Sequence, residues 1–311
     1  MGFAVPGTGS WAAAFAPGHV TGVFRPVLAP GDPLARGSIG AGVVLDLGAR
    51  ARAFARPAPP GQGRMELLEA GRPARLPITE RALSMLPKVR DHFLHVELTH
   101  ELPVSQGLSM SAAGALAASL AAASALGVPL TEAASAAHLA DLELHGGLGG
   151  VSAILDGGGV EVRRVAGLPP VGRIERTHLQ QGFFLGTTGA PLPSPPLLSD
   201  PAFLQRVREA ADTCVGALGP PPLMWEATLA VFERFTDALA LAPPALRRVL
   251  DDLRAQGCRA AQAMLGHTLV VWAGDEEAEA RCLSTLRRAH LTPWRVHVGA
   301  RGAGLVHLHP P

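Results

Sequence analysis

The arrangement of hydrophobic and polar positions along the chain predicts a buried helix near its centre, preceded by a strand. Residues 93–99 alternate apolar and polar side chains, which indicates a half-buried strand. Residues 111–126 are an Ala/Leu segment that is apolar on nearly every face, and such a helix is buried rather than amphipathic. Gly127 and Pro129 end this helix, and we expect Thr131 to cap a second one.

The first 64 residues combine short apolar runs with turn signals, and they predict short strands joined by loops. A strand at 11–15 is expected to end at the turn signal Pro17-Gly18. Residues 29–42 are dense in Gly and Pro and are expected to form a loop, and 57–64 suit a hairpin connection. Further strands are expected at 43–47 and 49–55, and a helix at 79–89.

The second half of the chain alternates strands and helices in the order of an α+β fold. Two short strands, 151–155 and 160–165, flank a Gly-rich turn and suggest a hairpin. A polar, Pro-rich stretch at 168–173 follows, and we place a domain boundary there, which gives domains at 1–170 and 171–311. The strands expected beyond it are 182–187, 268–272 and 294–298, and the helices are 200–217, 225–240, 244–256 and 275–289.

The overall composition excludes several function classes. The chain has 311 residues, 48% hydrophobic and 17% charged, which suffices for the cores of two ordinary domains. The formal net charge of +1 offers no strong field for nucleic acid or an acidic membrane surface. The apolar run 112–126 is shorter than the roughly 20 residues that a membrane span needs. We therefore expect neither a nucleic-acid nor a membrane partner.

The cysteines indicate a compartment. Cys214, Cys258 and Cys282 form no CxxC pair and no zinc pattern. An odd and sparse count is typical of buried free thiols in a reducing cytoplasm. The first eleven residues carry no positively charged stretch of the kind that begins a signal peptide. We expect a soluble, cytoplasmic protein.

The segment from Leu102 to Gly114 carries the most specific chemistry. Glycine and small hydroxyl residues let backbone N–H groups approach an anion, and the positive end of the following helix points at the same place. Ser111, at the start of that helix, is placed to reach a phosphate or a magnesium ion. The segment lacks the Gly-Lys-Ser/Thr of a Walker loop and the glycine spacing of a dinucleotide fold. A phosphate loop and a plain turn that caps a buried helix both stay open on these grounds.

The same segment resembles the central motif of the GHMP kinases (galacto-, homoserine, mevalonate and phosphomevalonate kinases), P-x-x-x-G-L-G-S-S-A-A. The matching residues are Pro103, Gly107, Leu108, Ser111, Ala112 and Ala113. Ser109 stands where glycine is usual and Met110 where the first serine is usual. A Met before the serine, with Ala-Gly-Ala-Leu after it, is similar to the pantoate kinase branch.

Two further segments resemble that branch and lie in its order. They are the N-terminal stretches 16–24 and 37–43, and Ala261-Gln262-Ala263-Met264-Leu265-Gly266-His267-Thr268 near the C-terminus. The resemblance implies a two-domain α+β GHMP kinase fold, with an N-terminal domain of mixed sheet and helices, a ferredoxin-like C-terminal domain, and the active site in the cleft between them. It also implies ATP and Mg2+ as cofactors and a homodimer.

The resemblance assigns the nucleotide end of the site. Phosphoryl transfer depends on positioning and on charge neutralisation by magnesium. Ser111 and Asp141 are the expected catalytic residues and magnesium ligands, and Glu143 is the alternate ligand. A solvated polar face, or a zinc site of His138, Asp141 and His145, are the alternatives on this helix. The residues expected at the nucleotide are Pro103, Gly107, Leu108, Ser109, Met110, Ser111 and Ala112.

The chain departs from the branch at residue 150. Pantoate kinases typically have Gly-Leu-Gly-Asp where this chain has Gly147-Leu148-Gly149-Gly150. The aspartate is the presumed catalytic base of many relatives, and Gly150 has no side chain to accept a proton. Since homoserine kinases manage without such a base, an enzyme that relies on magnesium and positioning is compatible with this sequence. A slow or degenerate kinase is the other interpretation, because losing a general base costs about 10²–10⁴ in rate.

The N-terminal motif offers candidates for an acceptor that carries a carboxylate and hydroxyls. An arginine can bond a carboxylate with two parallel N–H groups, and His, Thr and Ser can bond hydroxyls. The expected substrate-binding residues are His19, Thr21, Arg36, Ser38 and Gly266, of which Arg36 is the expected carboxylate partner. Surface charges for the arginines and a satisfied buried histidine are the alternatives.

The function implied by the resemblance is an ATP-dependent kinase that phosphorylates the primary hydroxyl of pantoate in coenzyme A biosynthesis. A kinase for another small hydroxy acid or alcohol is the second hypothesis. A catalytically weak protein that binds a nucleotide or a partner and regulates is the third, and Gly150 is the feature that favours it.

Overall fold

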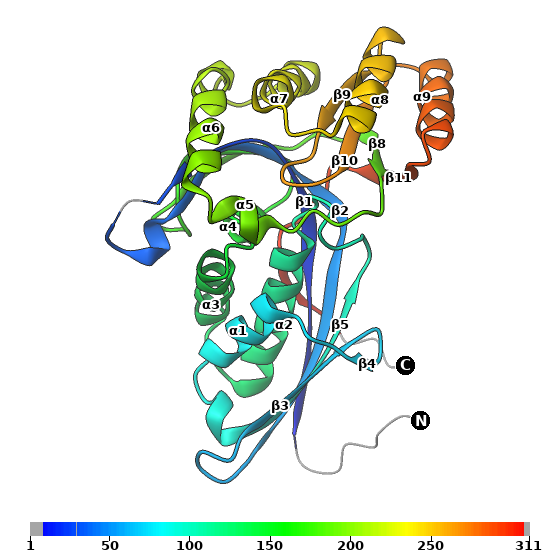
Figure 1. The fold of residues 1–311 in the computed structure, drawn as a ribbon. Helices are drawn as coiled ribbons and strands as arrows, with labels where there is room; N and C mark the ends of the chain where they lie inside the picture. Colours follow the sequence, from blue (N-terminus) through cyan, green and yellow to red (C-terminus); the bar gives the residue numbers. More distant parts are fainter. Residues whose placement is uncertain (1–8, 29, 308–311) are drawn as a thin grey trace.

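The computed structural model describes residues 9–28 and 30–307, which form two β-sheets with helices packed against them (Figure 1). The strands of the larger sheet are β1 (Ser10–Val27), β2 (Gly37–Pro57), β3 (Arg64–Glu69), β4 (Arg72–Pro73), β5 (His92–His100), β6 (Val160–Val165), β7 (Arg173–Thr177) and β12 (Gly304–Val306). Their order is β12-β1-β2-β5-β3-β4, and β6 pairs with both β2 and β7. The α+β class expected from the sequence is confirmed.

Strands β1 and β2 are much longer than the sequence predicts. They pair antiparallel along almost their whole length, so the expected stop at Pro17-Gly18 is wrong. The loop expected at 29–42 is shorter than predicted, because β2 begins at Gly37. The register shifts between Pro17 and His19, which marks a bulge. A bulge lets a strand absorb a proline and bend without ending, because the extra residue is left outside the ladder.

One face of the larger sheet is covered by helices (Figure 1). These helices are α1 (Pro77–Met85), α2 (Met110–Leu126), α3 (Leu130–Glu143) and α4 (Gly150–Leu155). Helix α2 packs against β1 and β2, where Ala49, Ala51 and Ala53 are buried. Small side chains on both surfaces let the helix and the sheet approach closely, so the Ala-rich run serves packing. The buried helix predicted at 111–126 is confirmed.

Arginines of β2 cover aromatic rings of the two neighbouring strands, β1 and β5. The pairs are Arg50 over Phe15, Arg52 over Trp11 and Arg56 over Phe93, with each guanidinium carbon 5.0 Å from the ring centre. An arginine stacked this way contributes about 0.5–1 kcal/mol at an exposed site and keeps its charge in water. These arginines therefore shield rings that would otherwise meet solvent.

The smaller sheet has the order β11-β8-β10-β9, with every neighbouring pair antiparallel. Its strands are β8 (Gly182–Thr187), β9 (Arg259–Gln262), β10 (Thr268–Trp272) and β11 (Thr292–His297). The helices of this half are α5 (Ser194–Leu198), α6 (Pro201–Asp212), α7 (Trp225–Leu239), α8 (Pro244–Ala255) and α9 (Glu276–Arg288). Short 3-10 turns lie at Pro33–Ala35, Val89–Asp91 and Val215–Ala217. The elements predicted for this half are present, and strand β9 and the short helix α5 are additions.

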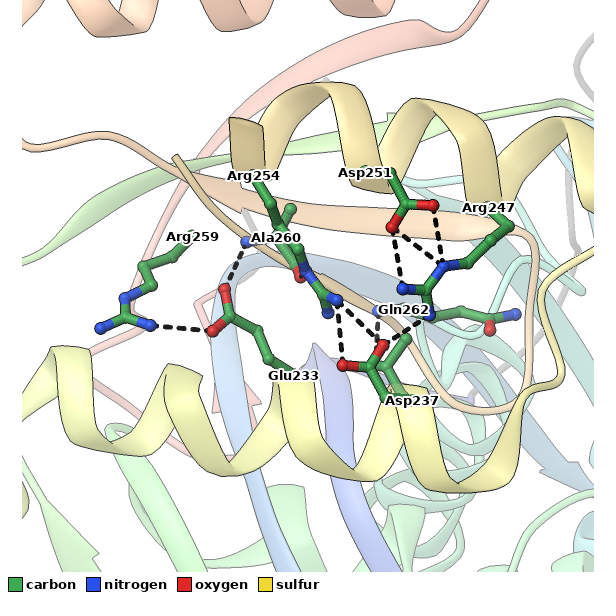
Figure 2. Close-up of polar contacts among 9 residues, drawn as sticks. Glu233, Asp237, Arg247, Asp251, Arg254, Arg259, Ala260 and Gln262 are labelled. Atoms are coloured by element: carbon green, nitrogen blue, oxygen red, sulfur yellow. Dashed lines mark hydrogen bonds and ion pairs between the residues drawn. The ribbon is translucent and has the colours of Figure 1, made fainter. Parts of the chain in front are cut away.

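Ion pairs tie α7 and α8 to β9 (Figure 2). Glu233 of α7 accepts hydrogen bonds from Arg259 and from the backbone N–H of Ala260, both at 2.9 Å. Asp237, one turn later, accepts from Arg247 and Arg254 of α8. Networks of charges hold geometry better than isolated pairs do. Strand β9 leads directly into a turn in the segment 261–268, which we call the third motif, so this network fixes the approach to that turn.

The larger sheet extends past the domain boundary expected near residue 170. Strand β7 pairs with β6, so the larger sheet continues to Thr177, and β12 returns to it from the chain's other end. The segment 151–155 lies in helix α4 rather than in a hairpin strand. Thr131 does not cap its helix, because α3 begins one residue earlier behind Pro129. The extent of the larger sheet was missed because sheet pairing between distant segments is invisible to local patterns.

The cysteines also differ from expectation. Cys258, just before β9, and Cys282, on α9, form a disulfide, whereas Cys214 is a buried free thiol.

Within the described ranges, no helix is both long and apolar enough to cross a membrane.

Candidate active site

A pocket lies where the segment Leu102 to Gly114, called the phosphate loop below, meets the turn of the third motif. The smaller-sheet half contributes Met264 and Leu265 from that turn and Ser194 and Leu198 from α5. The remaining lining residues come from the larger-sheet half and are Thr21, Phe24, Ser38, Ser105, Gly107, Leu108, Ser109, Met110, Ser111, Ala112, Asp141, Gly146, Gly147, Leu148, Gly149, Gly150 and Arg163. The pocket therefore lies between the two halves, as the fold expectation requires.

The N-terminus of α2 opens into this pocket. The first N–H groups of an α-helix have no partner within the helix, and they carry the positive end of its dipole. The first four residues of α2, Met-Ser-Ala-Ala, bring no negative charge. Ser109 precedes them with left-handed backbone angles (φ 52°), so its hydroxyl makes no capping bond within this described turn. The loop thus presents backbone donors and two free hydroxyls, those of Ser109 and Ser111, to an anion.

The phosphate loop and the third motif cross at two glycines. Gly107 has φ +81°, and a Cβ there would lie 2.6 Å from the carbonyl oxygen of Ala263 and 3.0 Å from Gly266. A Cβ on Gly266 would in turn overlap the backbone of Gln106. Two backbones approach this closely only where both lack side chains. The third motif therefore supports the phosphate loop, and Gly266 acts by packing rather than by contact with the pocket.

Asp141 is the only carboxylate among the described residues that line the pocket. It lies on α3 and is 3% exposed, and burial raises its pKa to about 7. Gly146 and Gly147 make room for it, because a Cβ on either would lie within 2.8 Å of its oxygens. A buried carboxylate with no other partner is stabilised by a divalent cation. With the Ser111 hydroxyl and nucleotide phosphates, this donor set fits Mg2+, which commonly takes one or two carboxylates plus phosphates.

Two expectations for α3 are corrected. Glu143 lies outside the pocket and pairs with Arg81 of α1, with Nε to Oε2 at 2.9 Å, so it is not placed to hold the same ion as Asp141. No group of three metal-ligating side chains occurs among the residues the structure describes, so His138, Asp141 and His145 do not form a zinc site. His138 bonds instead to the backbone of Arg36, and burial lowers its pKa to about 4.

Gly150 lines the pocket next to Ser109. A Cβ at residue 150 would lie 3.0 Å from the Ala112 Cβ and 3.5 Å from the Ser109 Oγ. The aspartate expected by resemblance would therefore extend into the same space as the phosphate loop. Here that space is bordered by a serine hydroxyl.

A buried polar network underlies the opposite wall. His19 is fully buried, and its Nε2 lies 3.0 Å from Oε1 of Glu161. The same oxygen accepts a hydrogen bond from Nη1 of Arg163, and the Thr21 hydroxyl lies 3.3 Å from His19 Nδ1. Thr21 and Arg163 line the pocket, whereas His19 and Glu161 are behind them. Among the described atoms, Nε of Arg163 has no hydrogen-bond partner.

The expected acceptor residues thus divide into two groups. Thr21 and Ser38 line the pocket as predicted, and Gly149 leaves room there for Ser38, since a Cβ would lie 2.8 Å from its Oγ. The predicted site residues that lie outside the pocket wall described here are His19, Arg36, Pro103, Glu143 and Gly266. Arg36 follows the 3-10 turn at Pro33–Ala35 and is only half-buried.

Arg163 was missed by the sequence analysis, although a signal existed. Glu161 and Arg163 alternate with valines in β6, so they share one face of a strand. Both side chains are buried, at 0% and 3% exposure. Two charges on one buried strand face are rare unless they are paired, and such pairs cluster at functional sites.

Comparisons with known proteins find relatives that align with much of the chain. Residues 78–158 match the family model described as the GHMP kinases N terminal domain. A pantoate kinase from Thermococcus kodakarensis is 35% identical over 167 residues, which span 51% of this chain and 53% of that protein, so the aligned part covers about half of that relative. A pantoate kinase from Methanospirillum hungatei is 27% identical over 258 residues, 81% of this chain and 84% of the relative.

Solved structures share the fold along nearly the whole chain. A phosphotransferase related to the CoA biosynthesis pathway aligns with a TM-score of 0.80 at 24% identity, covering 96% of this chain and 99% of that one. A homoserine kinase from Cytophaga hutchinsonii aligns with a TM-score of 0.61 at 14% identity, covering 98% and 100%. At these identities the likeness concerns the fold. Together with the domain match, it shows that residues 78–158 resemble the GHMP kinases N terminal domain and that the chain has the fold of these structures.

Proposed function

We propose that this chain transfers the γ-phosphoryl group of ATP to the primary hydroxyl of pantoate, giving 4-phosphopantoate for coenzyme A biosynthesis. The observation that carries the proposal is the pairing, in one pocket, of an anion-binding helix N-terminus with the buried guanidinium of Arg163. The first suits the nucleotide phosphates and the second an acceptor carboxylate. Two relatives named pantoate kinase support this choice of acceptor.

The nucleotide end is formed by the phosphate loop. Backbone N–H groups at the start of α2 would hold phosphate oxygens, and Ser111 and Asp141 would hold Mg2+. When bound, Mg2+ neutralises charge that develops on the phosphates during transfer. Met264 and Leu265 close the pocket from the smaller-sheet half and limit its access to water.

The acceptor end is formed by Arg163, Thr21 and Ser38. Arginine bonds a carboxylate with two parallel N–H groups, which fixes orientation as well as affinity. Thr21 and Ser38 line the same pocket and present hydroxyls to the hydroxyl groups of the acceptor. The carboxylate at Arg163 would hold the acceptor so that its primary hydroxyl approaches the phosphate loop.

A second candidate function is favoured by Gly150. Because no carboxylate extends from residue 150, the chain has lost one means of accepting the proton of the acceptor hydroxyl. A protein that binds nucleotide and turns over slowly would look the same. Phosphoryl transfer nevertheless depends mainly on positioning and electrostatics, so an enzyme can work without that base at a lower rate.

Replacing Arg163 tests the assignment of the acceptor. Arg163→Met is expected to raise the KM for pantoate about 100-fold, which corresponds to losing a buried, hydrogen-bonded charge pair, and to leave the KM for ATP within about twofold. Arg164→Met is the matched control, because Arg164 is the next residue of β6 and pairs with Glu175 outside the pocket. Equal effects of the two substitutions on the KM for pantoate would contradict the proposed role of Arg163.

A further inference from the structure

Thr21 and Arg163 line the acceptor side of the pocket. They are connected by hydrogen bonds through His19 and Glu161, which do not line it. The connection runs from the Thr21 hydroxyl to His19 Nδ1, from His19 Nε2 to Glu161, and from Glu161 to Arg163. His19 and Glu161 are each 0% exposed, so no acceptor can touch them. Whatever they contribute to substrate binding must act through Thr21 and Arg163.

The directions of these hydrogen bonds follow from the charges. Burial alone would raise the pKa of Glu161, but Arg163 and the hydrogen bond from His19 outweigh it, so the pKa of Glu161 lies below its ordinary value. Burial lowers the pKa of His19 despite the neighbouring carboxylate, so the ring is neutral. An ionised carboxylate only accepts, and the proton of the neutral ring therefore sits on Nε2. Nδ1 is then an acceptor, and the Thr21 hydroxyl donates to it.

This arrangement fixes what each residue offers to the pocket. The Thr21 hydroxyl donates its hydrogen bond to His19, so only the lone pairs of its oxygen remain available to an acceptor molecule. Arg163 donates one N–H to Glu161 and lines the pocket, and its buried Nε has no partner among the described residues. One wall of the pocket therefore presents a hydrogen-bond acceptor and a cationic donor. Their chemical complement is a hydroxyl group and a carboxylate on one small molecule.

We propose that Glu161 is a positioning residue that sets this hydrogen-bond polarity, through His19 at Thr21 and directly at Arg163, and so selects acceptors that carry both a hydroxyl and a carboxylate. The proposal rests on the proposed function and adds to it the residues that enforce acceptor choice. It gives His19 an indirect role, in place of the direct contact expected from the sequence.

The network contributes little to the stability of the sheet, which argues against a purely structural role. A Cβ on Gly42 would overlap the His19 ring, so β2 has no side chain where the imidazole lies. The second oxygen of Glu161 is buried and has no partner within the described chain. Replacing a buried ion pair by packed apolar residues is often neutral or stabilising. A network that leaves a carboxylate oxygen unsatisfied serves stability poorly, whereas it orients two residues of the pocket well.

Two substitutions at Glu161 distinguish the effect of the carboxylate's position from the effect of its charge. Glu161→Asp keeps the charge and withdraws the carboxylate by one methylene, and Glu161→Gln keeps the shape and removes the charge. Each is expected to raise the KM for pantoate at least tenfold while kcat and the KM for ATP change less than threefold. Glu175→Gln is the matched control, since Glu175 pairs with Arg164 on the neighbouring strand outside the pocket. Variants that lower the melting temperature but leave the KM for pantoate unchanged would overturn the proposal.

Thr21 gives an independent test that leaves the buried charges in place. Thr21→Val removes the hydroxyl and is expected to raise the KM for pantoate about tenfold, whereas Thr21→Ser is expected to restore it to within about threefold of the natural chain. Equal KM values for the valine and serine variants would contradict the role given to the hydroxyl.

Nitrogen-15 NMR of the His19 ring tests the proton assignment without any turnover. The expected spectrum shows a protonated Nε2 and a bare Nδ1 at pH 7, assigned by the loss of these signals in His19→Gln. A protonated Nδ1 would overturn the proposal even if pantoate is phosphorylated. If the chain does not phosphorylate pantoate, the proposed function fails, and this spectrum still decides whether the network has the stated polarity.

Discussion

Asp141 illustrates how a single residue can be costly to the fold and useful to the site. It is buried in the pocket, and its pKa is raised to about 7 because it is withheld from water. An acid whose pKa is higher in the folded state binds more protons there than in the unfolded chain. Without Mg2+, the free energy of unfolding should therefore fall as pH rises from about 4 to about 7, by up to roughly 4 kcal/mol.

The Asp141→Asn variant tests this cost. Its melting temperature in EDTA should be close to that of the natural chain at pH 4 and clearly above it at pH 8, since an amide does not ionise. Mg-ATP should stabilise the natural chain more than the variant, because binding to the folded state alone raises stability. A difference in melting temperature that is the same at pH 4 and pH 8 would show that Asp141 does not titrate as described.

Gly150 makes a second prediction at the residue scale. Gly150→Asp is expected to raise kcat about tenfold or more, because its carboxylate would extend into the pocket beside Ser109 and take up the proton of the acceptor hydroxyl. Gly150→Ala is the control, since it introduces the same close contact with Ala112 and no carboxylate. If the two variants have equal kcat values under saturating substrates, residue 150 does not limit the chemical step.

The sequence could predict the residues whose positions are set by local motifs. Ser109, Ser111, Thr21 and Asp141 line the pocket as expected, because each lies on or beside a segment with its own glycine or helix-start signature. Arg163 was missed because its relation to the pocket depends on the pairing of β6 with β2, which brings it near Gly149. The alternation of Glu161 and Arg163 with valines indicates two charges on one strand face, but it does not show what that face packs against.

At the scale of elements, the crossing of two loops organises the site. Gly266→Ala should force the third-motif turn away from Gln106, lower the free energy of unfolding by about 1–3 kcal/mol, and raise the KM for ATP about tenfold. Gly274→Ala is the control, because a Cβ there would meet nothing closer than 3.9 Å. An unchanged KM for ATP in a destabilised Gly266→Ala variant would contradict this account, because it would show that the turn does not affect ATP binding at the phosphate loop.

Elements defined by their own periodicity were predicted more accurately than the long strands. Helices α2, α7 and α8 begin and end within one residue of the expected bounds. Strands β1 and β2 were broken up in the prediction, because Gly and Pro are turn signals in isolation. In the structure these residues lie within a paired ribbon whose bulges absorb them.

At the scale of the molecule, the two halves share a boundary that holds the site. Phe24 of β1 packs against Phe235 of α7, with ring centres 5.9 Å apart, and the backbone N–H of Met264 donates to the carbonyl of Thr21 at 3.0 Å. The acceptor wall and the third motif are thereby held in one frame. The family fold carries this arrangement, and substrate choice depends on the few side chains that line the pocket.

The most direct test of the proposed function is ADP release from Mg-ATP with pantoate, measured beside homoserine and mevalonate. Turnover that requires pantoate, with a product phosphorylated on the primary hydroxyl by phosphorus-31 NMR, is the expected result. Homoserine and mevalonate also carry a carboxylate and a primary hydroxyl, so Arg163 and Thr21 alone do not exclude them. The two relatives named pantoate kinase lead us to expect that these acceptors give at most a few per cent of that rate. ATP binding without turnover on pantoate, or turnover that is equal with homoserine, would contradict the proposed function.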